Sequence, residues 1–138
     1  MQIIDDLIQN WDVCVLATTD GIQPHASIRT YFVDHAAMKF YFLSRKETRT
    51  DKNIKKHPHV SLLIDDRDKD LTLTIEGVYS PIKNEQTIDA IIKLYLIKHP
   101  GMEKFSEHPD TELVRVVGKK AQLVQGLEDV FETNLKNS

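Results

Sequence analysis

The chain has 138 residues, of which 41% are hydrophobic and 28% charged, and its net charge at pH 7 is −3. This length predicts a single domain spanning residues 1–138, and the apolar content is too high for a disordered chain. The acidic balance argues against nucleic acid as a partner. No stretch approaches the roughly 18 apolar residues of a membrane span, and the acidic N-terminus does not fit a signal peptide. We therefore expect a cytoplasmic protein without a membrane partner.

The first part of the chain predicts a helix followed by antiparallel strands. Apolar spacing indicates an amphipathic helix over residues 2–11, and the apolar run 13–18 indicates a buried strand that ends in a turn at Asp20-Gly21. Residues 25–33 alternate between two faces. One face holds Ala26, Ile28, Thr30 and Phe32, and the other holds His25, Ser27, Arg29 and Tyr31. We assign the first face to the core and the second to a polar groove.

Residues 38–43 repeat this alternation, so a hairpin is expected to bring residues 27–31 opposite residues 39–43. Thr48 and Asp51 form a capping box that begins a helix, which Pro58 ends. Strands follow over residues 60–64 and 71–79, and Asn84 caps an apolar-striped helix that stops before Pro100. The last β segment or segments cover residues 113–117 and 121–125, with a bend or bulge at Gly118 between them. Six or seven mostly short strands with inserted helices indicate an α+β fold, mainly β, built as an antiparallel barrel with flanking helices.

One short basic segment lies in this otherwise acidic chain. Six basic and two acidic residues fall between Ser44 and His57, which leaves −7 for the remainder. A helix N-terminus at Thr48 would favour an anion, and the Arg49 side chain could hold it with two parallel hydrogen bonds. Hydroxyls of Ser44 and Thr48 and the mobile charges of Lys46 and Lys52 could add to such a site. The alternative is a solvated basic first turn of a surface helix.

The polar strand face with Ser27, Arg29 and Tyr31 makes the basic segment more specific, because one groove could then hold an elongated ligand with a phosphate tail. Ser27 and Thr30 could equally be ordinary strand residues. The stretches VCVLATTDGIQPHASIRTYFV and MKFYFLSRKETRTDKNIKKHPHVSLLID then show a resemblance. They resemble the pyridoxamine 5'-phosphate oxidase-like, FMN-binding split β-barrel superfamily over about residues 10–80.

This resemblance implies FMN as cofactor, a homodimer with the cofactor at its interface, and a set of site residues. The residues implied near the flavin ring and ribityl chain are Ser27, Ile28, Arg29 and Thr30, followed by Phe42, Leu43 and Ser44. The residues implied near the phosphate are Thr48, Arg49 and Asn53, with Lys46 or Lys52 in place of a lysine that many relatives carry where this chain has Thr50. Apolar surface at Tyr31, Tyr41 and Leu43, opposite the expected core face, mildly supports the dimer.

The function implied by the resemblance is that of an FMN-dependent oxidoreductase in which no side chain need act as acid or base. The C-terminal Trp and Arg of true pyridoxamine phosphate oxidases are missing, because Trp11 is the only tryptophan. We therefore do not expect synthesis of pyridoxal phosphate. The alternative is a non-catalytic flavin- or haem-binding module on the same barrel. His57, His59 or His99 could ligate haem iron, but histidines beside proline at helix ends are more often structural, so no metal site is expected.

Overall fold

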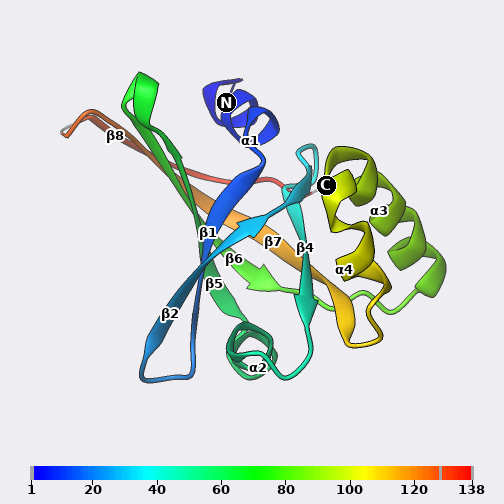
Figure 1. Ribbon diagram of the computed structural model, residues 1–138. Coiled ribbons are helices and arrows are strands. Elements are labelled where there is room, and N and C mark those ends of the chain that lie inside the picture. The colour runs from blue at the N-terminus through cyan, green and yellow to red at the C-terminus, as the bar shows by residue number, and fades with distance from the viewer. Residues whose placement is uncertain (1, 128, 138) are drawn as a thin grey trace.

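The computed structural model describes residues 2–127 and 129–137 and shows one antiparallel sheet curled into a half-barrel (Figure 1). The strands follow the order β2-β1-β5-β6-β7-β4-β3, and β8 pairs with β7 outside this path. The elements are α1 (Gln2–Asn10), β1 (Val13–Thr19), β2 (Pro24–Thr30), β3 (Phe32–Asp34), β4 (Lys39–Arg45), α2 (Arg49–Lys56), β5 (His59–Asp66), η1 (Arg67–Lys69), β6 (Leu71–Tyr79), α3 (Glu85–Lys98), η2 (Pro100–Met102), α4 (Glu103–Glu107), β7 (Thr111–Gln125) and β8 (Asp129–Asn134). The mainly β, α+β fold predicted from the sequence is confirmed.

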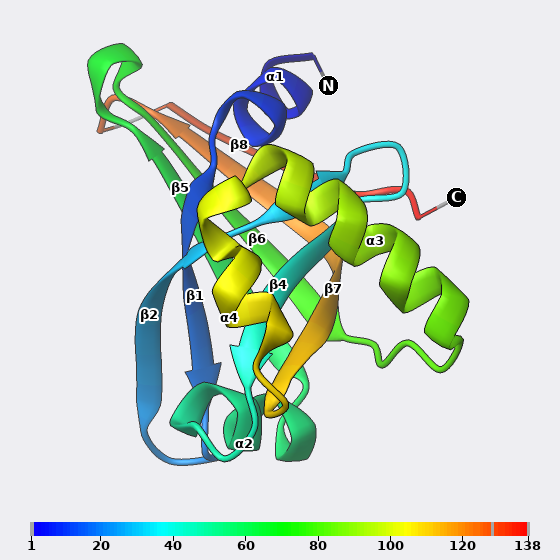
Figure 2. The same ribbon diagram turned by 45° about the vertical axis from the view of Figure 1, so that its right-hand side comes forward.

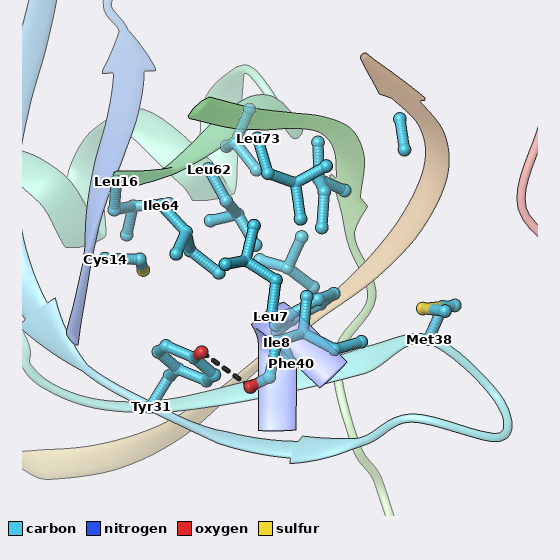
Figure 3. Packing of buried hydrophobic residues seen from close by; sticks show 14 of the residues in the cluster. Leu7, Ile8, Cys14, Leu16, Tyr31, Met38, Phe40, Leu62, Ile64 and Leu73 are labelled. Atoms are coloured by element: carbon cyan, nitrogen blue, oxygen red, sulfur yellow. Dashed lines mark hydrogen bonds between the residues drawn. The ribbon is translucent and has the colours of Figure 1, made fainter. Parts of the chain in front are cut away.

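Helices cover the two ends and one side of the curled sheet (Figure 1). The inner faces of β1, β4, β5, β6 and β7 form the core, which α1 joins with Leu7 and Ile8 (Figure 3). The alternation predicted for β6 is confirmed, since Leu71, Leu73 and Ile75 are all buried. Among the described residues, none of the helices is both long and apolar enough to cross a membrane.

The strand predicted over residues 25–33 differs from the structure in two ways. The chain breaks at Tyr31, so that β2 pairs with β1 whereas the short β3 pairs with β4. The expected pairing of residues 27–31 with residues 39–43 is therefore wrong. The face assignment is also wrong, because Tyr31 is fully buried and Ile28 is 76% exposed.

The register between β1 and β2 explains this inversion. Arg29 lies opposite Cys14, whose side chain points into the core, and Ile28 lies opposite Val15 on the outer face. Paired residues of neighbouring strands share a face. The alternation within β2 is correct, but only its partner strand decides which set of side chains faces inward.

Burial on both faces of β4 corrects a second expectation. Tyr41 and Leu43 were expected to leave apolar surface exposed, as was Tyr31, yet all three are buried within the single chain. The Tyr41 hydroxyl interacts with Arg115 of β7, and Leu43 lies beside Phe105 of α4. The outer face of β4 is thus covered by the chain itself.

The predicted bend at Gly118 is a β-bulge in one continuous strand, β7. Gly118 pairs with Gly77 of β6, whereas the preceding β6 residue, Glu76, pairs with Lys120, so one residue of β7 is extra. The two strands approach closely at this point. A Cβ atom at Gly77 would lie 2.6 Å from Val116 Cγ1 and 3.0 Å from the Val117 carbonyl oxygen.

Substitution Gly77→Ala should destabilise the fold by about 1–3 kcal/mol, because buried backbone and side-chain atoms must shift to admit the methyl group. Gly101→Ala is the matched control, since nothing lies within 4 Å of a Cβ atom there. Chemical denaturation of both variants measures the difference. Equal stability of the two variants would contradict the close packing at the bulge.

Candidate functional site

A groove of about 370 Å³ lies between β2, β4 and the segment that includes η2 and α4. Figure 2 shows how these elements are arranged. The residues that line it are Ser27, Ile28, Arg29, Thr30, Leu43, Met102 and Phe105. Five of these were expected near a ligand from the sequence. Although the predicted strand pairing is wrong, β2 and Leu43 of β4 still border the same space.

Arg29 supplies the main charge of this groove. Its side chain is half-buried, and its Nε donates a hydrogen bond to Ser27 Oγ at 3.1 Å. No ion pair involves Arg29 in the part of the chain that the structure describes. Burial lowers the pKa of the guanidinium, which nevertheless remains protonated at neutral pH. A half-buried cation without an acidic partner favours an anionic or electron-rich ligand.

The end of α3 holds the β2 side of the groove in place. The Tyr95 hydroxyl hydrogen-bonds with the Thr30 hydroxyl and donates to the Thr30 carbonyl at 3.3 Å. His99 Nε2 lies 2.7 Å from the Tyr31 carbonyl oxygen, so this nitrogen acts as a donor. The same nitrogen is therefore engaged with the backbone and is not free to ligate iron. Of the apolar stripe predicted for this helix, only Tyr95 is fully buried.

Beyond Leu43, β4 leads into the basic segment at the start of α2. Thr48 is the N-cap, because its Oγ1 accepts a hydrogen bond from the Asp51 N–H at 3.3 Å. Arg49 is exposed, and so is Lys52, which pairs with exposed Glu47 at 3.5 Å. The predicted helix start is therefore confirmed. The backbone N–H groups of the first turn of α2 point out of this end of the helix, where a phosphate would be favoured.

The remaining candidates are buried below this surface. Phe42 belongs to the core cluster. Asn53 Nδ2 donates to Thr18 Oγ1 at 3.1 Å and so ties α2 to β1. Ser44 Oγ is buried with no hydrogen-bond partner among the described residues. The structure thus separates the candidates into groove residues (Ser27, Ile28, Arg29, Thr30 and Leu43), exposed or half-buried residues at the helix start (Lys46, Thr48, Arg49 and Lys52) and buried residues (Phe42, Ser44 and Asn53).

Sequence reasoning missed Met102 and Phe105 as groove residues. Their spacing of three residues is compatible with one face of a helix, which was a usable signal. Their place beside β2 was not readable, because it depends on how the chain returns across β4 after α3. Phe105 also packs against Arg45, whose guanidinium carbon lies 4.9 Å from the ring centroid.

A curled antiparallel sheet with a groove beside β2 and a basic helix start after β4 defines a split-barrel protein. The sequence profile of the pyridoxamine 5'-phosphate oxidase family matches residues 2–125, and the chain belongs to this family. Members of the family commonly bind flavin and are typically dimeric. No curated protein matches the chain.

Solved structures with the same fold include proteins with different described roles. A haem-binding protein from Mycobacterium smegmatis has 18% identity and a TM-score of 0.81, over 94% of this chain and 55% of that protein. The chain therefore spans about half the length of that relative. A Clostridium acetobutylicum protein related to general stress protein 26, of the pyridoxinephosphate oxidase family, has 14% identity and a TM-score of 0.78, over 97% and 93% of the two chains. General stress protein 26 from Bacillus anthracis has 17% identity and a TM-score of 0.74, over 97% of each chain.

Because Asn53 donates a buried hydrogen bond to Thr18, its removal should destabilise the fold, whereas removal of the exposed side chain of Lys52 should not. Asn53→Ala should reduce the free energy of unfolding by about 1–2 kcal/mol, because the buried Thr18 hydroxyl loses its partner. Lys52→Ala, on the same helix but exposed, should change it by less than about 0.5 kcal/mol. Urea denaturation compares the two variants, and an Asn53→Ala variant as stable as the wild type would contradict this role.

Proposed function

We propose that this chain is an FMN-binding flavoprotein and an oxidoreductase, but not a true pyridoxamine phosphate oxidase. The observation that supports this best is the half-buried Arg29, which has no acidic partner among the described residues. It lies in a groove beside β4, the strand that leads to the basic start of α2. The groove also offers apolar contacts from Ile28, Met102 and Phe105. An electron-rich planar ring with a phosphate tail fits these residues.

Each part of the proposed site would do a different task. Ser27, Ile28, Arg29 and Thr30 would bind the ring and the ribityl chain, with the β4 residues Phe42, Leu43 and Ser44 alongside. Thr48 and Arg49 would bind the phosphate at the helix start, and Asn53 would hold α2 in position from below. Thr50 is uncharged and only 2% exposed, so it cannot take the place of the lysine that many relatives carry there. The mobile positive charge would come from Lys46 or Lys52.

The bound flavin would supply hydride or electron transfer. The contribution of the chain is to position the ring, to exclude water from one side of it and to stabilise negative charge with Arg29. Reduction of the FMN-loaded protein by NADH or NADPH, followed by absorbance under anaerobic conditions, tests the oxidoreductase part. If neither nucleotide nor any physiological donor reduces the flavin, the non-catalytic module is the better description.

The proposal includes a homodimer with the cofactor at its interface. Ile28 of β2, Val15 of β1 and Leu63 of β5 are aligned across three neighbouring strands. All three lie on the outer face of the sheet, where Ile28 and Leu63 are exposed and Val15 is half-buried. Ile28 also borders the groove, so a partner subunit on this face would help to close the site.

Haem is the second candidate cofactor, and the observation in its favour is the fold shared with the Mycobacterium smegmatis haem-binding protein. The described residues contain no group of three side chains that could hold a metal ion. A haem iron needs only one or two axial ligands, and His57 and His59 lie at the end of α2. A visible spectrum distinguishes the two cofactors, because haem gives a sharp Soret band.

Wild-type protein incubated with FMN should keep a flavin spectrum after gel filtration. Arg49→Ala should weaken FMN binding about ten- to one-hundred-fold, as expected for the loss of a charged hydrogen bond. Riboflavin affinity should not change, since riboflavin lacks the phosphate. Lys56→Ala, an exposed cation in the last turn of α2, is the matched control. Fluorescence titration with FMN and with riboflavin measures the affinities of the wild type and the variants, and equal losses of FMN affinity in the two variants would contradict a phosphate site at the start of the helix.

Substitution Leu63→Asp should convert the dimer to a monomer, because an ionised carboxylate would be buried at the proposed interface without a partner. Leu127→Asp is the control at a side chain that is 98% exposed, in the turn before β8. Size-exclusion chromatography with light scattering gives the masses. A dimer that survives Leu63→Asp would place the interface elsewhere.

A further inference from the structure

Figure 1 shows α2 at one end of the barrel. Charged side chains of α2 and β7 form a cluster there. Lys55 Nζ of α2 lies 2.9 Å from Asp51 Oδ2 and 2.7 Å from Glu112 Oε1 of β7. Glu112 is aligned with Ser44 across β4 and β7, on the face that also carries the core residue Phe42. We call Asp51, Lys55 and Glu112 the α2 acid cluster.

Asp51 is the most enclosed member of the cluster, with 2% of the residue exposed. Its Oδ1 is buried and has no hydrogen-bond donor in residues 2–127 and 129–137 other than what Glu112 could provide. The two carboxyl groups lie within hydrogen-bonding reach of each other. Two ionised carboxylates cannot form that bond, but a carboxylic acid and a carboxylate can. A proton between them would satisfy the buried Asp51 Oδ1.

The charges around the pair agree with this arrangement. Burial and contact with Glu112 raise the pKa of Asp51 to about 6. Burial opposes ionisation of Glu112 too, yet the hydrogen bonds from Asp51 and Lys55 lower its pKa. The hydrogen bonds that Lys55 donates to Glu112 and Asp51 raise the pKa of Lys55, which stays protonated. The Lys46 ammonium also lowers the pKa of Glu112. The nearby Tyr79 phenol is neutral, because burial and the charges of the two acids raise its pKa.

Asp51 also belongs to the first turn of α2, where its backbone N–H binds the Thr48 cap. When both acids are ionised the cluster has a net charge of −1 with Lys55, and when they share a proton it is neutral. The additional negative charge would lie directly beneath the helix start and would oppose a phosphate there. The protonation of the cluster and the occupancy of the helix start are thus linked.

We propose that Asp51 and Glu112 are positioning residues that share a proton, so that binding of a phosphate group at the start of α2 takes up this proton from solvent and weakens as the pH rises. The inference rests on the proposed FMN site. Above the pKa of the pair, where both acids are ionised in the free protein, binding of one phosphate transfers up to one proton from solvent to the Asp51–Glu112 pair, with no bond made or broken elsewhere. The predicted weakening of binding as the pH rises is opposite to the effect of the phosphate's own ionisation. The second ionisation of a phosphate, near pH 6, strengthens its binding to cations as the pH rises.

Dividing the dissociation constant of the wild type by that of a variant cancels the pH dependence of the phosphate itself, because both proteins bind the same ligand. The dissociation constant for FMN is measured for wild type, Asp51→Asn and Glu112→Gln between pH 5 and 8 at low salt. The ratio of wild-type to Asp51→Asn constants should rise on the order of tenfold across this range, as expected for one unit charge acting at intermediate dielectric. Glu112→Gln should give the same trend if the two acids share one proton. A second variant also protects the test against a folding defect in the first.

Controls separate this effect from a general change of structure. With riboflavin, which has no phosphate, the ratio should be constant. Glu132→Gln removes a distant carboxylate that pairs with Lys120 and should leave the FMN profile unchanged. A flat FMN ratio in a protein that binds FMN overturns only this inference, as does an equal slope with riboflavin. Failure of the wild type to retain FMN at any pH overturns the proposed function itself.

The shared proton is also tested without a ligand. Carboxyl carbon NMR of the free protein should show Asp51 titrating near pH 6, with a simultaneous response from Glu112. Independent titrations of both groups at their ordinary values near 4 would overturn the proposal.

Discussion

Tyr31 joins α1, the residue before β1 and the end of α3 through one side-chain and two backbone hydrogen bonds. Its hydroxyl donates to the Ile8 carbonyl of α1 at 2.6 Å, as Figure 3 shows, and its carbonyl accepts from His99 after α3. Its own N–H donates to the Asp12 carbonyl at 3.1 Å, just before β1. Because each of these groups is buried or constrained, the chain must change direction at this residue. That change separates β2 from β3 and sends each to a different neighbour in the sheet.

The candidate site follows from this change of direction. Among the described strands β2 pairs with β1 alone, so its other edge can border the groove, and its outer face leaves Ile28 exposed. A single strand therefore contributes Arg29 to the interior of the groove and Ile28 to the surface proposed for a partner. The α3 contacts at Thr30 keep this strand at a fixed place relative to β4. A rigid strand is better suited than a mobile loop to orient a planar cofactor.

The electrostatics of the site have two layers. Exposed cations such as Arg49 and Lys52 stand around the start of α2 and would attract a phosphate from solution. Below them, Lys55 joins the buried Asp51 to the half-buried Glu112. Exposed charges are screened by salt, whereas the buried Asp51 carboxylate is screened much less. On our proposal, the inner acids would tune the strength of phosphate binding through pH, and the surface cations would set its dependence on ionic strength.

The sequence by itself determined the local elements, because they depend on neighbours along the chain. Capping by Thr48 and Asn84, the alternation of β6 and the bulge at Gly118 were all readable, since each follows from residues a few positions apart. The family was readable as well, from the order of these elements. Only the tertiary structure decided which face of β2 is buried, because an alternating strand has two equivalent faces until a partner strand fixes its register. It also decided that Phe105 borders the groove and that Asp51 meets Glu112, since both contacts join segments that are far apart in the chain.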